Sequence, residues 1–471
     1  MAAKMIDLVF IPFTAPSHFA AFVKLAKLLT DTDERISVTM LMLKTPVPLK
    51  VDLTGYSRIR CVQIIPKEPS TPEAMGWGET ALVRVFASQK EAVRHTVAEI
   101  IEDPTKNVAG FVMDVFCAAA TEVADEFRVP SYVFFTSGAA VLGLALHFQK
   151  IRQEFGPEHL VAQLEAGGAD LEFSISTFVN PFPARALPSS VYEKGIGLLV
   201  QFGYFKNCKG IMLNTFLELE SHALKTLLAE ENFPNIYPIG PMSMVGPSNK
   251  EGEKKAEILE WLDHQPDSSV VFICFGTNGS FDIQQVKEIA TALEKSGHRF
   301  LWSLRKPPPE GKFELVGEYQ DPGEVLPEGF LQRTSGVGRV IGWAPQMAVL
   351  SHPSVGGFVS HCGWNSALES VYCGVPMAVW PLYAEQPANS FLFVKELGIA
   401  VEIMFEYRRG CGKIVGAEKI EKAIRELMDP DNEIRVKIKA MQEKCKITYD
   451  KGGPSRDYLE RLIQEFVQNV S

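Results

Sequence analysis

A polar and aromatic cluster at residues 358–369, which read FVSHCGWNSALE, is where this sequence first indicates chemistry. An apolar, strand-like run gives way to His361, Gly363, Asn365 and Ser366, and an amphipathic helical pattern follows. A helix that begins where a strand ends presents free N–H groups and the positive end of its dipole, which favour an anion. Because Gly363 permits close backbone approach and its neighbours can donate hydrogen bonds, this corner predicts a phosphate site.

An alternative explanation covers part of the same corner. Ser366 and Glu369 have the S-x-x-E spacing of a capping box, in which a serine and a glutamate satisfy the first N–H groups of a helix. Capping accounts for these two residues but not for His361 or Trp364. The sequence alone leaves both explanations open for Ser366 and Glu369.

A candidate acid–base pair lies in the first half of the chain. His18 follows the first predicted strand, and Asp114 ends the predicted strand at 108–113, so both are expected at the carboxyl edge of a parallel sheet. Imidazole has an ordinary pKa of about 6.5, which suits proton removal near neutral pH. A buried aspartate needs a partner, and a His–Asp hydrogen bond would fix the tautomer of the ring. A structurally satisfied histidine and a helix N-cap aspartate are the alternatives.

Two further groups of hydroxyl side chains follow predicted strands. Thr136 closes the strand at 131–135, where a simple turn or cap residue is the alternative explanation. The stretch FGTNGS at 275–280 follows the strand at 270–274 and supplies Thr277 and Ser280. We expect this second loop to lie on the phosphate side of the same site.

The elements that must position these residues alternate between strand and helix throughout the chain. Alternation of this kind predicts parallel sheets covered by helices. The segment 239–255 is rich in Gly, Pro, Ser and Lys, which is typical of a linker. The sequence therefore predicts an α/β protein with two doubly wound, Rossmann-like domains that face across a cleft. Ligands of such sheets bind beyond the carboxyl ends of the strands.

Composition excludes several classes of function. The net charge of −10 and the lack of a Lys/Arg-rich block argue against a nucleic-acid binder. Eight scattered cysteines with no C-x-x-C pair predict a reducing compartment without a disulfide framework. The N-terminus lacks the layout of a signal peptide, and the one long apolar stretch, 129–148, is interrupted by Pro130 and by polar residues. We expect a cytoplasmic protein with no membrane span that acts as a monomer.

Residues 343–386 read WAPQMAVLSHPSVGGFVSHCGWNSALESVYCGVPMAVWPLYAEQ. This stretch resembles, without a gap, the signature box of plant secondary-metabolite UDP-glycosyltransferases, family 1 enzymes of the GT-B fold. The resemblance extends to GIMLNTFLELE at 210–220, IYPIGP at 236–241 and WLDHQPDSSVVFICFG at 261–276. It implies an acceptor-binding domain at 1–240, a linker at 241–255 and a UDP-sugar domain at 256–452. It also implies that the helix within 453–471 packs back on the first domain.

The resemblance also implies a role for each matching residue. His18 is the base, although the Gly and Pro of the family's Gly-His-x-x-Pro setting are Ser17 and Ala21 here. The residues that the resemblance assigns to the donor are Trp343, Ala344 and Gln346 for the nucleoside, Glu369 for the ribose, His361, Asn365 and Ser366 for the diphosphate, and Thr136, Trp364, Glu385 and Gln386 for the sugar. His352 matches as well, as a structural residue. In this family a final Gln tends to accompany glucose.

The implied activity is an inverting, UDP-glucose-dependent O-glucosyltransferase that acts on a flavonoid, another phenolic or a terpenoid and needs no metal or other cofactor. Segments 67–80 and 155–200 are expected to be loops that shape the acceptor site. Three alternatives stay open: another UDP-sugar donor, a nucleotide-sugar epimerase or hydrolase, and a non-catalytic binder of UDP-sugars or aglycones. A metal-dependent transferase would need an Asp-x-Asp pair, and the chain offers Asp31 with Asp33 and Asp429 with Asp431, each in a polar turn.

Overall fold

The computed structural model describes residues 5–45, 52–66, 79–192, 197–242, 253–309, 316–407 and 412–470. The chain divides into two units. Unit 1 consists of Met1–Pro181, Ser189–Gly246 and Ile447–Ser471, and unit 2 of Phe182–Pro188 and Pro247–Lys446. Most of the predicted loop at 67–80 and of the predicted linker at 241–255 lies outside the described residues, as do residues 193–196. The assignment of acceptor and donor binding to 1–240 and 256–452 stays a prediction.

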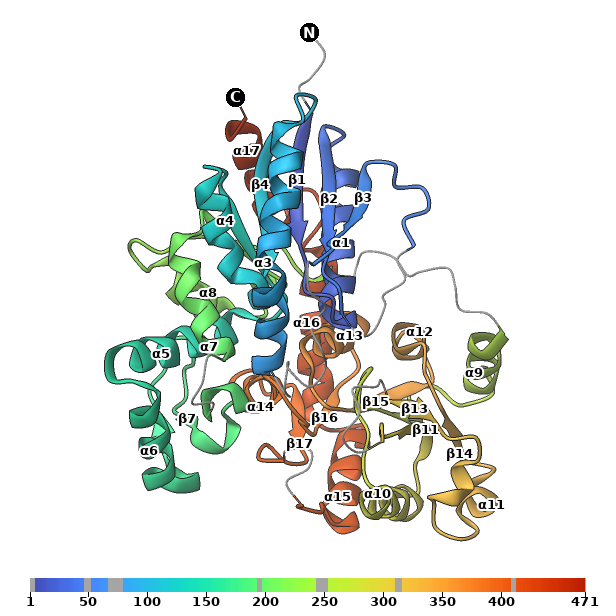
Figure 1. The fold of residues 1–471 in the computed structure, drawn as a ribbon. Helices are drawn as coiled ribbons and strands as arrows, with labels where there is room; N and C mark the ends of the chain where they lie inside the picture. Colours follow the sequence, from blue (N-terminus) through green and yellow to red (C-terminus); the bar gives the residue numbers. More distant parts are fainter. Residues whose placement is uncertain are drawn as a thin grey trace. The chain divides into compact units, whose positions relative to one another are not determined.

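Unit 1 is built on a seven-stranded sheet in the order β3-β2-β1-β4-β5-β8-β9, and every pairing is parallel (Figure 1). The strands are β1 (Ile6–Ile11), β2 (Ile36–Met42), β3 (Ile59–Gln63), β4 (Val108–Asp114), β5 (Ser131–Phe135), β8 (Gly210–Leu213) and β9 (Asn235–Pro238). The strand order reverses between β1 and β4. Such a switch point leaves a crevice beyond the carboxyl ends of the two strands, where ligands bind.

Helices cover this sheet and join its parallel strands. The main ones are α1 (Pro16–Thr32), α3 (Glu79–Glu102), α4 (Thr121–Glu126), α5 (Ala139–Phe155), α6 (Pro157–Gly167), α7 (Leu198–Gln201), α8 (Ser221–Leu228) and α17 (Pro454–Gln468). Short elements of unit 1 are β6 (Glu172–Phe173) and the 3₁₀ turns η1 (Val115–Ala120), η2 (Gly168–Asp170), η4 (Ser189–Tyr192) and η5 (Phe202–Asn207). The prediction of a loop over 155–200 is wrong for its first part, because α6 forms there and buries Leu160, Val161 and Leu164.

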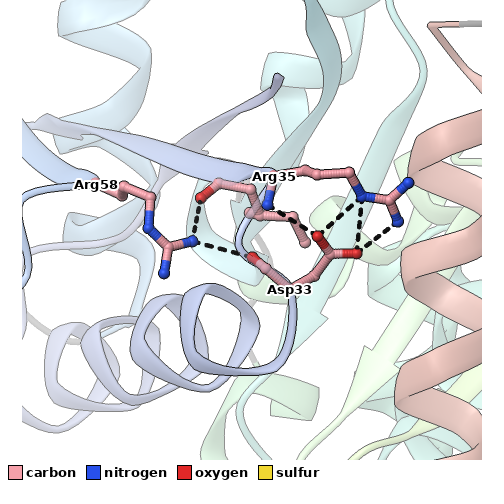
Figure 2. Close-up of polar contacts among 4 residues, drawn as sticks. Asp33, Arg35 and Arg58 are labelled. Carbon is pink, nitrogen blue, oxygen red and sulfur yellow. Dashed lines mark hydrogen bonds and ion pairs between the residues drawn. The ribbon is translucent and has the colours of Figure 1, made fainter. Parts of the chain in front are cut away.

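The end of α1 shows how charged side chains set the turn into β2 (Figure 2). Arg58 donates to the carbonyl oxygens of Thr30 and Asp33, which the end of α1 leaves open, and to that of Ile36, where β2 begins. The Asp33 carboxylate in turn accepts from the backbone N–H and the guanidinium of Arg35. The hydrogen bond from Arg35 lowers the pKa of Asp33. These contacts fix where β2 begins.

The last helix, α17, belongs to unit 1 although it ends the chain. Figure 1 shows it in dark red beside β4, and it also contacts β9. Glu465 accepts hydrogen bonds from the hydroxyls of Tyr132 (2.7 Å) and Tyr237 (2.6 Å). Its apolar face enters the core of the unit through Leu459, Leu462, Ile463 and Phe466. Burial raises the pKa of both tyrosines, so their hydroxyls remain donors.

Unit 2 contains a second parallel sheet, in the order β14-β11-β10-β15-β16-β17. Its strands are β10 (Val270–Cys274), β11 (Arg299–Ser303), β14 (Gly338–Ile341), β15 (Val355–Ser360), β16 (Met377–Val379) and β17 (Ala400–Glu402). Here the order reverses between β10 and β15. The two doubly wound α/β sheets that the sequence predicts are confirmed.

The helices of unit 2 are α9 (Glu253–Asp263), α10 (Ile283–Ser296), α11 (Phe330–Thr334), α12 (Gln346–Leu350), α13 (Trp364–Cys373), α14 (Gln386–Phe391), the π-helical turn η8 (Leu392–Glu396), α15 (Ala417–Met428) and α16 (Glu433–Ile447). A small antiparallel ribbon pairs β12 (Arg305–Lys306) with β13 (Gly317–Glu318), and η7 (Pro322–Glu324) follows it. The segment 182–188, with β7 (Phe182–Pro183) and η3 (Ala184–Ala186), also belongs to this unit. Its Phe182 ring lies 4.9 Å from that of Phe391 in α14.

Among the described residues, no helix combines the length and apolar character needed to cross a membrane.

Candidate active site

The histidine and the aspartate that the sequence singles out meet at the switch point of unit 1. Pro16 begins α1, which places His18 in its first turn just beyond β1, and Asp114 is the last residue of β4. The Nδ1 atom of His18 lies 2.7 Å from Oδ2 of Asp114. The other carboxylate oxygen accepts the backbone N–H of Phe116 at 3.0 Å and caps η1. Asp114 therefore fills both roles considered for it, with one oxygen for each.

This geometry assigns the protons of the pair. Asp114 is fully buried, and a carboxylate only accepts hydrogen bonds, so Nδ1 of His18 carries its proton toward Oδ2. The lone pair of the neutral ring then resides on Nε2, which is the arrangement of a general base. The histidine side chain is 24% exposed, and its ring packs 5.2 Å from that of Phe116.

Thr136 also reaches the histidine. Its Oγ1 lies 3.2 Å from Nδ1 of His18. Because the Nδ1 proton points to Asp114, the threonine oxygen is a second, weaker acceptor, and its own hydroxyl proton is directed elsewhere. Thr136 can therefore touch the base and still donate to a ligand.

A residue that sequence reasoning missed holds the turn that carries Thr136. The Glu220 carboxylate accepts the N–H groups of Ala139 (2.8 Å) and Ala140 (2.9 Å), at the start of α5. A carboxylate at this end of a helix also meets the positive end of its dipole. Burial raises the pKa of Glu220 above its ordinary value, and these hydrogen bonds offset only part of that rise. In the sequence, the polar end of the run at 210–220 is the feature that could have indicated a role for Glu220.

In unit 2 the corner after β15 has the predicted form. Gly363 is the N-cap residue of α13, without a side-chain cap, and Gly374 ends the helix with φ +65°. Ser366 therefore lies inside the first turn, and the capping-box explanation, which needs Ser366 itself at the N-cap, is wrong. Cys362 holds a φ of +57°, a left-handed conformation that is costly for a residue other than glycine. A strained backbone of this kind persists when the surrounding structure holds it, and it is most common at functional sites.

His361 is enclosed by the two loops of the unit 2 switch point. A Cβ atom added at Gly276 or at Gly363 would lie 2.6 Å from its Nε2, so both positions need glycine for the ring to fit. Gly276, with φ +74°, belongs to the loop after β10 that the sequence assigns to the phosphate side. Burial lowers the pKa of His361 to about 4. The ring is neutral at pH 7 and can offer one N–H to an anion.

This buried imidazole predicts a dependence of stability on pH. The unfolded ring takes up a proton near its ordinary pKa of 6.5, whereas the folded ring does so only near 4. Stability is therefore unaffected above pH 6.5 and falls as the pH decreases from 6.5 toward 4. At pH 5 the loss attributable to this residue is about 2 kcal/mol. Melting temperatures of the wild type and of His361→Gln between pH 8 and 5 measure it. Parallel curves for the two proteins would contradict the assignment.

The two hydroxyl residues predicted in the loop after β10, Thr277 and Ser280, differ in exposure. Thr277 is exposed, just beyond Gly276. Ser280 is 3% exposed, and its Oγ has no hydrogen-bond partner among the described residues. The structure therefore places Thr277 on the surface of the loop and Ser280 in the interior.

Three predicted nucleotide residues form one network between α12 and α13. The Nε2 of Gln346 donates to Oγ of Ser366 (2.9 Å) and to Oε2 of Glu369 (2.7 Å). The carboxylate of Glu369 can also accept from a diol. Trp343 is 44% exposed, unusual for an indole and suited to a stacking surface, whereas the neighbouring Ala344 is buried. Asn365 is half-buried in the first turn of α13.

The residues predicted to contact the sugar differ in burial and in the groups they can offer to a ligand. The indole of Trp364 is 2% exposed and packs edge-on against Phe393, so a ligand contact from this residue would come from its backbone N–H. Glu385 is the N-cap residue of α14. The side-chain oxygen of Gln386 accepts the N–H groups of Leu382 (2.8 Å) and Tyr383 (3.1 Å), which leaves its NH₂ group as the donor.

The remaining candidates make structural contacts. His352 contacts Ser354 (2.8 Å) and Asp263 (3.0 Å), one with each ring nitrogen. Asp33 pairs with Arg35, as described above, and Asp429 accepts the N–H of Asp431 within its turn. Across the part of the chain that the structure describes, no cluster of three or more His, Cys, Asp or Glu side chains has the arrangement to hold a metal ion.

Comparisons with known proteins bear on the chain as a whole. Residues 213–434 match the family model described as UDP-glucoronosyl and UDP-glucosyl transferase. The chain is similar to UDP-glycosyltransferase 71A15 of Malus domestica (45% identity; 98% of this chain, 99% of the relative). It is equally similar to UDP-glucose flavonoid 3-O-glucosyltransferase 6 of Fragaria ananassa (45%; 98% and 99%). Among solved structures, Medicago truncatula UGT71G1 complexed with UDP-glucose has a TM-score of 0.87 at 34% identity, with 98% of each chain covered.

Proposed function

The chain belongs to the family of plant UDP-glycosyltransferases, and on that premise we propose that it transfers glucose from UDP-glucose to a hydroxyl group of a small apolar plant metabolite. The observation that carries the proposal is the 2.7 Å contact between His18 and Asp114 at the switch point of unit 1. A protein that only bound a UDP-sugar would have no use for an oriented base. We propose that the residues of unit 2 assigned to the donor bind UDP-glucose.

The proposed transfer is a single displacement. Nε2 of His18 takes the proton of the acceptor hydroxyl while the hydroxyl oxygen forms a bond to the anomeric carbon. The bond from that carbon to the UDP oxygen breaks on the opposite face, so the α-linked donor gives a β-glucoside. Asp114 stabilises the imidazolium that forms. The proton thus ends on His18, and the electron pair of the broken bond ends on UDP.

The charge that grows on the departing diphosphate is met by unit 2. The N–H groups of the first turn of α13 and the neutral His361 are the proposed donors, with the hydroxyl of Thr277 on the adjoining loop. Gly276 and Gly363 leave the space that the His361 ring occupies between the two loops, which supports a preformed set of donors. Preorganised hydrogen-bond donors aimed at developing charge make the largest single contribution to the rate enhancement of many enzymes.

Buried aromatic side chains make the surroundings of the base apolar, which favours an apolar acceptor. The ring of Phe116 packs against His18, and that of Phe13 lies 5.2 Å from Phe116. Small-molecule sites are mostly apolar with a few placed polar groups. The named relative from Fragaria acts on a flavonoid, which favours this class. We also propose that terpenoid alcohols are acceptors and that the enzyme is monomeric and cytoplasmic; the described cysteines are free thiols.

Gln386 provides a test of donor selection. In Gln386→Glu the loop N–H groups of Leu382 and Tyr383 keep an acceptor, but the NH₂ donor is lost, so we expect KM for UDP-glucose to rise about three- to tenfold. Gln386→His retains one acceptor for two N–H groups, so glucose transfer should fall further and donor preference should shift. Steady-state kinetics with UDP-glucose and UDP-galactose measure both variants. Unchanged donor profiles would exclude a sugar contact.

The proposed function is tested by incubating the enzyme with UDP-glucose and a panel of flavonoids, simple phenols and terpenoid alcohols. We expect mass spectrometry to find a hexoside of at least one acceptor and NMR to assign its β configuration. Parallel reactions with EDTA should run at the same rate. Free glucose without a glucoside would identify a hydrolase, conversion to UDP-galactose an epimerase, and UDP-glucose binding without turnover a non-catalytic binder.

A further inference from the structure

One peptide group next to the candidate stacking surface is held at both ends. The carbonyl oxygen of Gly342 accepts the hydroxyl of Ser303 at 2.6 Å. The N–H of Trp343 donates to Oε1 of Glu318 at 2.9 Å. Because this carbonyl and this N–H belong to the same peptide plane, the two contacts fix how that plane is turned. We call these four residues the peptide clamp.

The clamp determines the direction in which the indole leaves the backbone. A peptide plane that cannot rotate fixes ψ of Gly342 and φ of Trp343, and therefore the Cα–Cβ bond of Trp343. The indole is 44% exposed, so packing against neighbours holds only part of it. The main chain therefore sets the direction in which the ring extends, and χ1 and χ2 of Trp343 set the plane of the ring.

The sequence around the clamp is shaped to admit the Glu318 carboxylate. A Cβ atom at position 342 would lie 2.5 Å from Cδ of Glu318, so glycine is what lets the carboxylate approach the Trp343 N–H. Glu318 lies on β13, which pairs with β12. Arg305 of β12 also donates to the carbonyl oxygens of Gly317 (3.1 Å) and Val316 (3.0 Å). The ribbon therefore presents Glu318 from a fixed backbone.

We propose that Glu318 is a positioning residue for the nucleobase: together with Ser303 it clamps the peptide between Gly342 and Trp343 and so orients the indole that stacks on uracil. The inference rests on the proposed function, because it takes Trp343 as the uracil-binding surface. Glu318 acts through Trp343 and touches neither the diphosphate nor the reacting atoms. Its effect is therefore confined to the affinity for the uridine part of the donor.

The first experiment compares Glu318→Ala with Glu318→Gln, which keeps an acceptor oxygen for the Trp343 N–H. In Glu318→Ala we expect the Kd for UDP and for uridine and the KM for UDP-glucose each to rise about fivefold, the usual net effect of one hydrogen bond, because Glu318 is exposed and water screens its charge. We expect kcat and inhibition by inorganic pyrophosphate to stay unchanged. Glu318→Gln should lie within about twofold of the wild type, since an amide oxygen also accepts the N–H. Glu324→Ala, which removes an exposed carboxylate from the same segment, is the matched control.

A second variant tests the contact itself. In Gly342→Ala the new methyl group displaces the Glu318 carboxylate, so its effect on uridine affinity should not add to that of Glu318→Ala in the double variant. Additive effects would overturn the clamp. So would a Glu318→Ala protein with unchanged uridine affinity, or one whose pyrophosphate inhibition weakens equally. If the wild type binds UDP, those results overturn the positioning role alone; a wild type that binds no UDP overturns the proposed function with it.

Discussion

The His18→Ala variant is expected to lose at least about a thousandfold in kcat, within the range that a positioned general base contributes. The loss is large because the acceptor hydroxyl is a poor nucleophile until its proton is removed, and Nε2 of His18 is the atom oriented for that step. Affinity for UDP should not change, because the candidate nucleotide residues all lie in unit 2. Single-turnover rates and calorimetry with UDP measure the two quantities separately.

The exposed His95 is a suitable control for this experiment, since His95→Ala removes an imidazole from unit 1 at a surface position. We expect that control to keep wild-type kinetics. A His18→Ala enzyme that retains more than about a tenth of the wild-type kcat would rule out the base assignment, because a positioned base contributes more than that.

The Asp114→Asn variant is expected to lose about a hundredfold or more in kcat without a matching loss of stability. The asparagine oxygen can still accept the Phe116 N–H and cap η1, so the backbone keeps its conformation. Its NH₂ group, however, would face Nδ1 of His18 as a donor. The ring must then carry its proton on Nε2, the atom that has to receive one.

The predicted signature of Asp114→Asn is therefore a large kinetic defect in a protein with nearly the wild-type melting temperature. Asp114→Ala is the informative comparison, because it also leaves the Phe116 N–H without its cap and should lower the melting temperature as well. A wild-type rate in Asp114→Asn would show that the aspartate serves η1 and not the histidine.

The parts of this molecule that the sequence predicts are those with local patterns or with a topological rule behind them. The corner after β15 is contiguous in sequence, so its strand, turn and helix can be recognised together. His18 and Asp114 are far apart in the chain, yet each follows a strand of one parallel sheet, and neighbouring strands deliver their ends to one edge. That rule was enough to bring the two side chains together.

Contacts made by isolated polar residues could not be predicted in this way. Glu318 lies on a strand of two residues, 25 positions before the N–H that it accepts, and no periodicity marks it. Glu220 lies 80 positions or more from the N–H groups it holds. The short edge strands β9 and β17 and the excursion of residues 182–188 into unit 2 also lack a pattern long enough to recognise. The capping-box alternative fails because α13 begins two residues before Ser366, at a position that only the backbone reveals.

The docking of α17 has a consequence for how the protein is made. The tyrosines that pair with Glu465 belong to strands completed by residue 238, but the helix itself ends at Gln468. Until α17 has been synthesised, unit 1 lacks part of its core. The face that packs against Leu459, Leu462, Ile463 and Phe466 stays uncovered. A chain truncated before α17 would keep that apolar face exposed, so the truncation should yield aggregates and substrates for chaperones in place of a shortened enzyme.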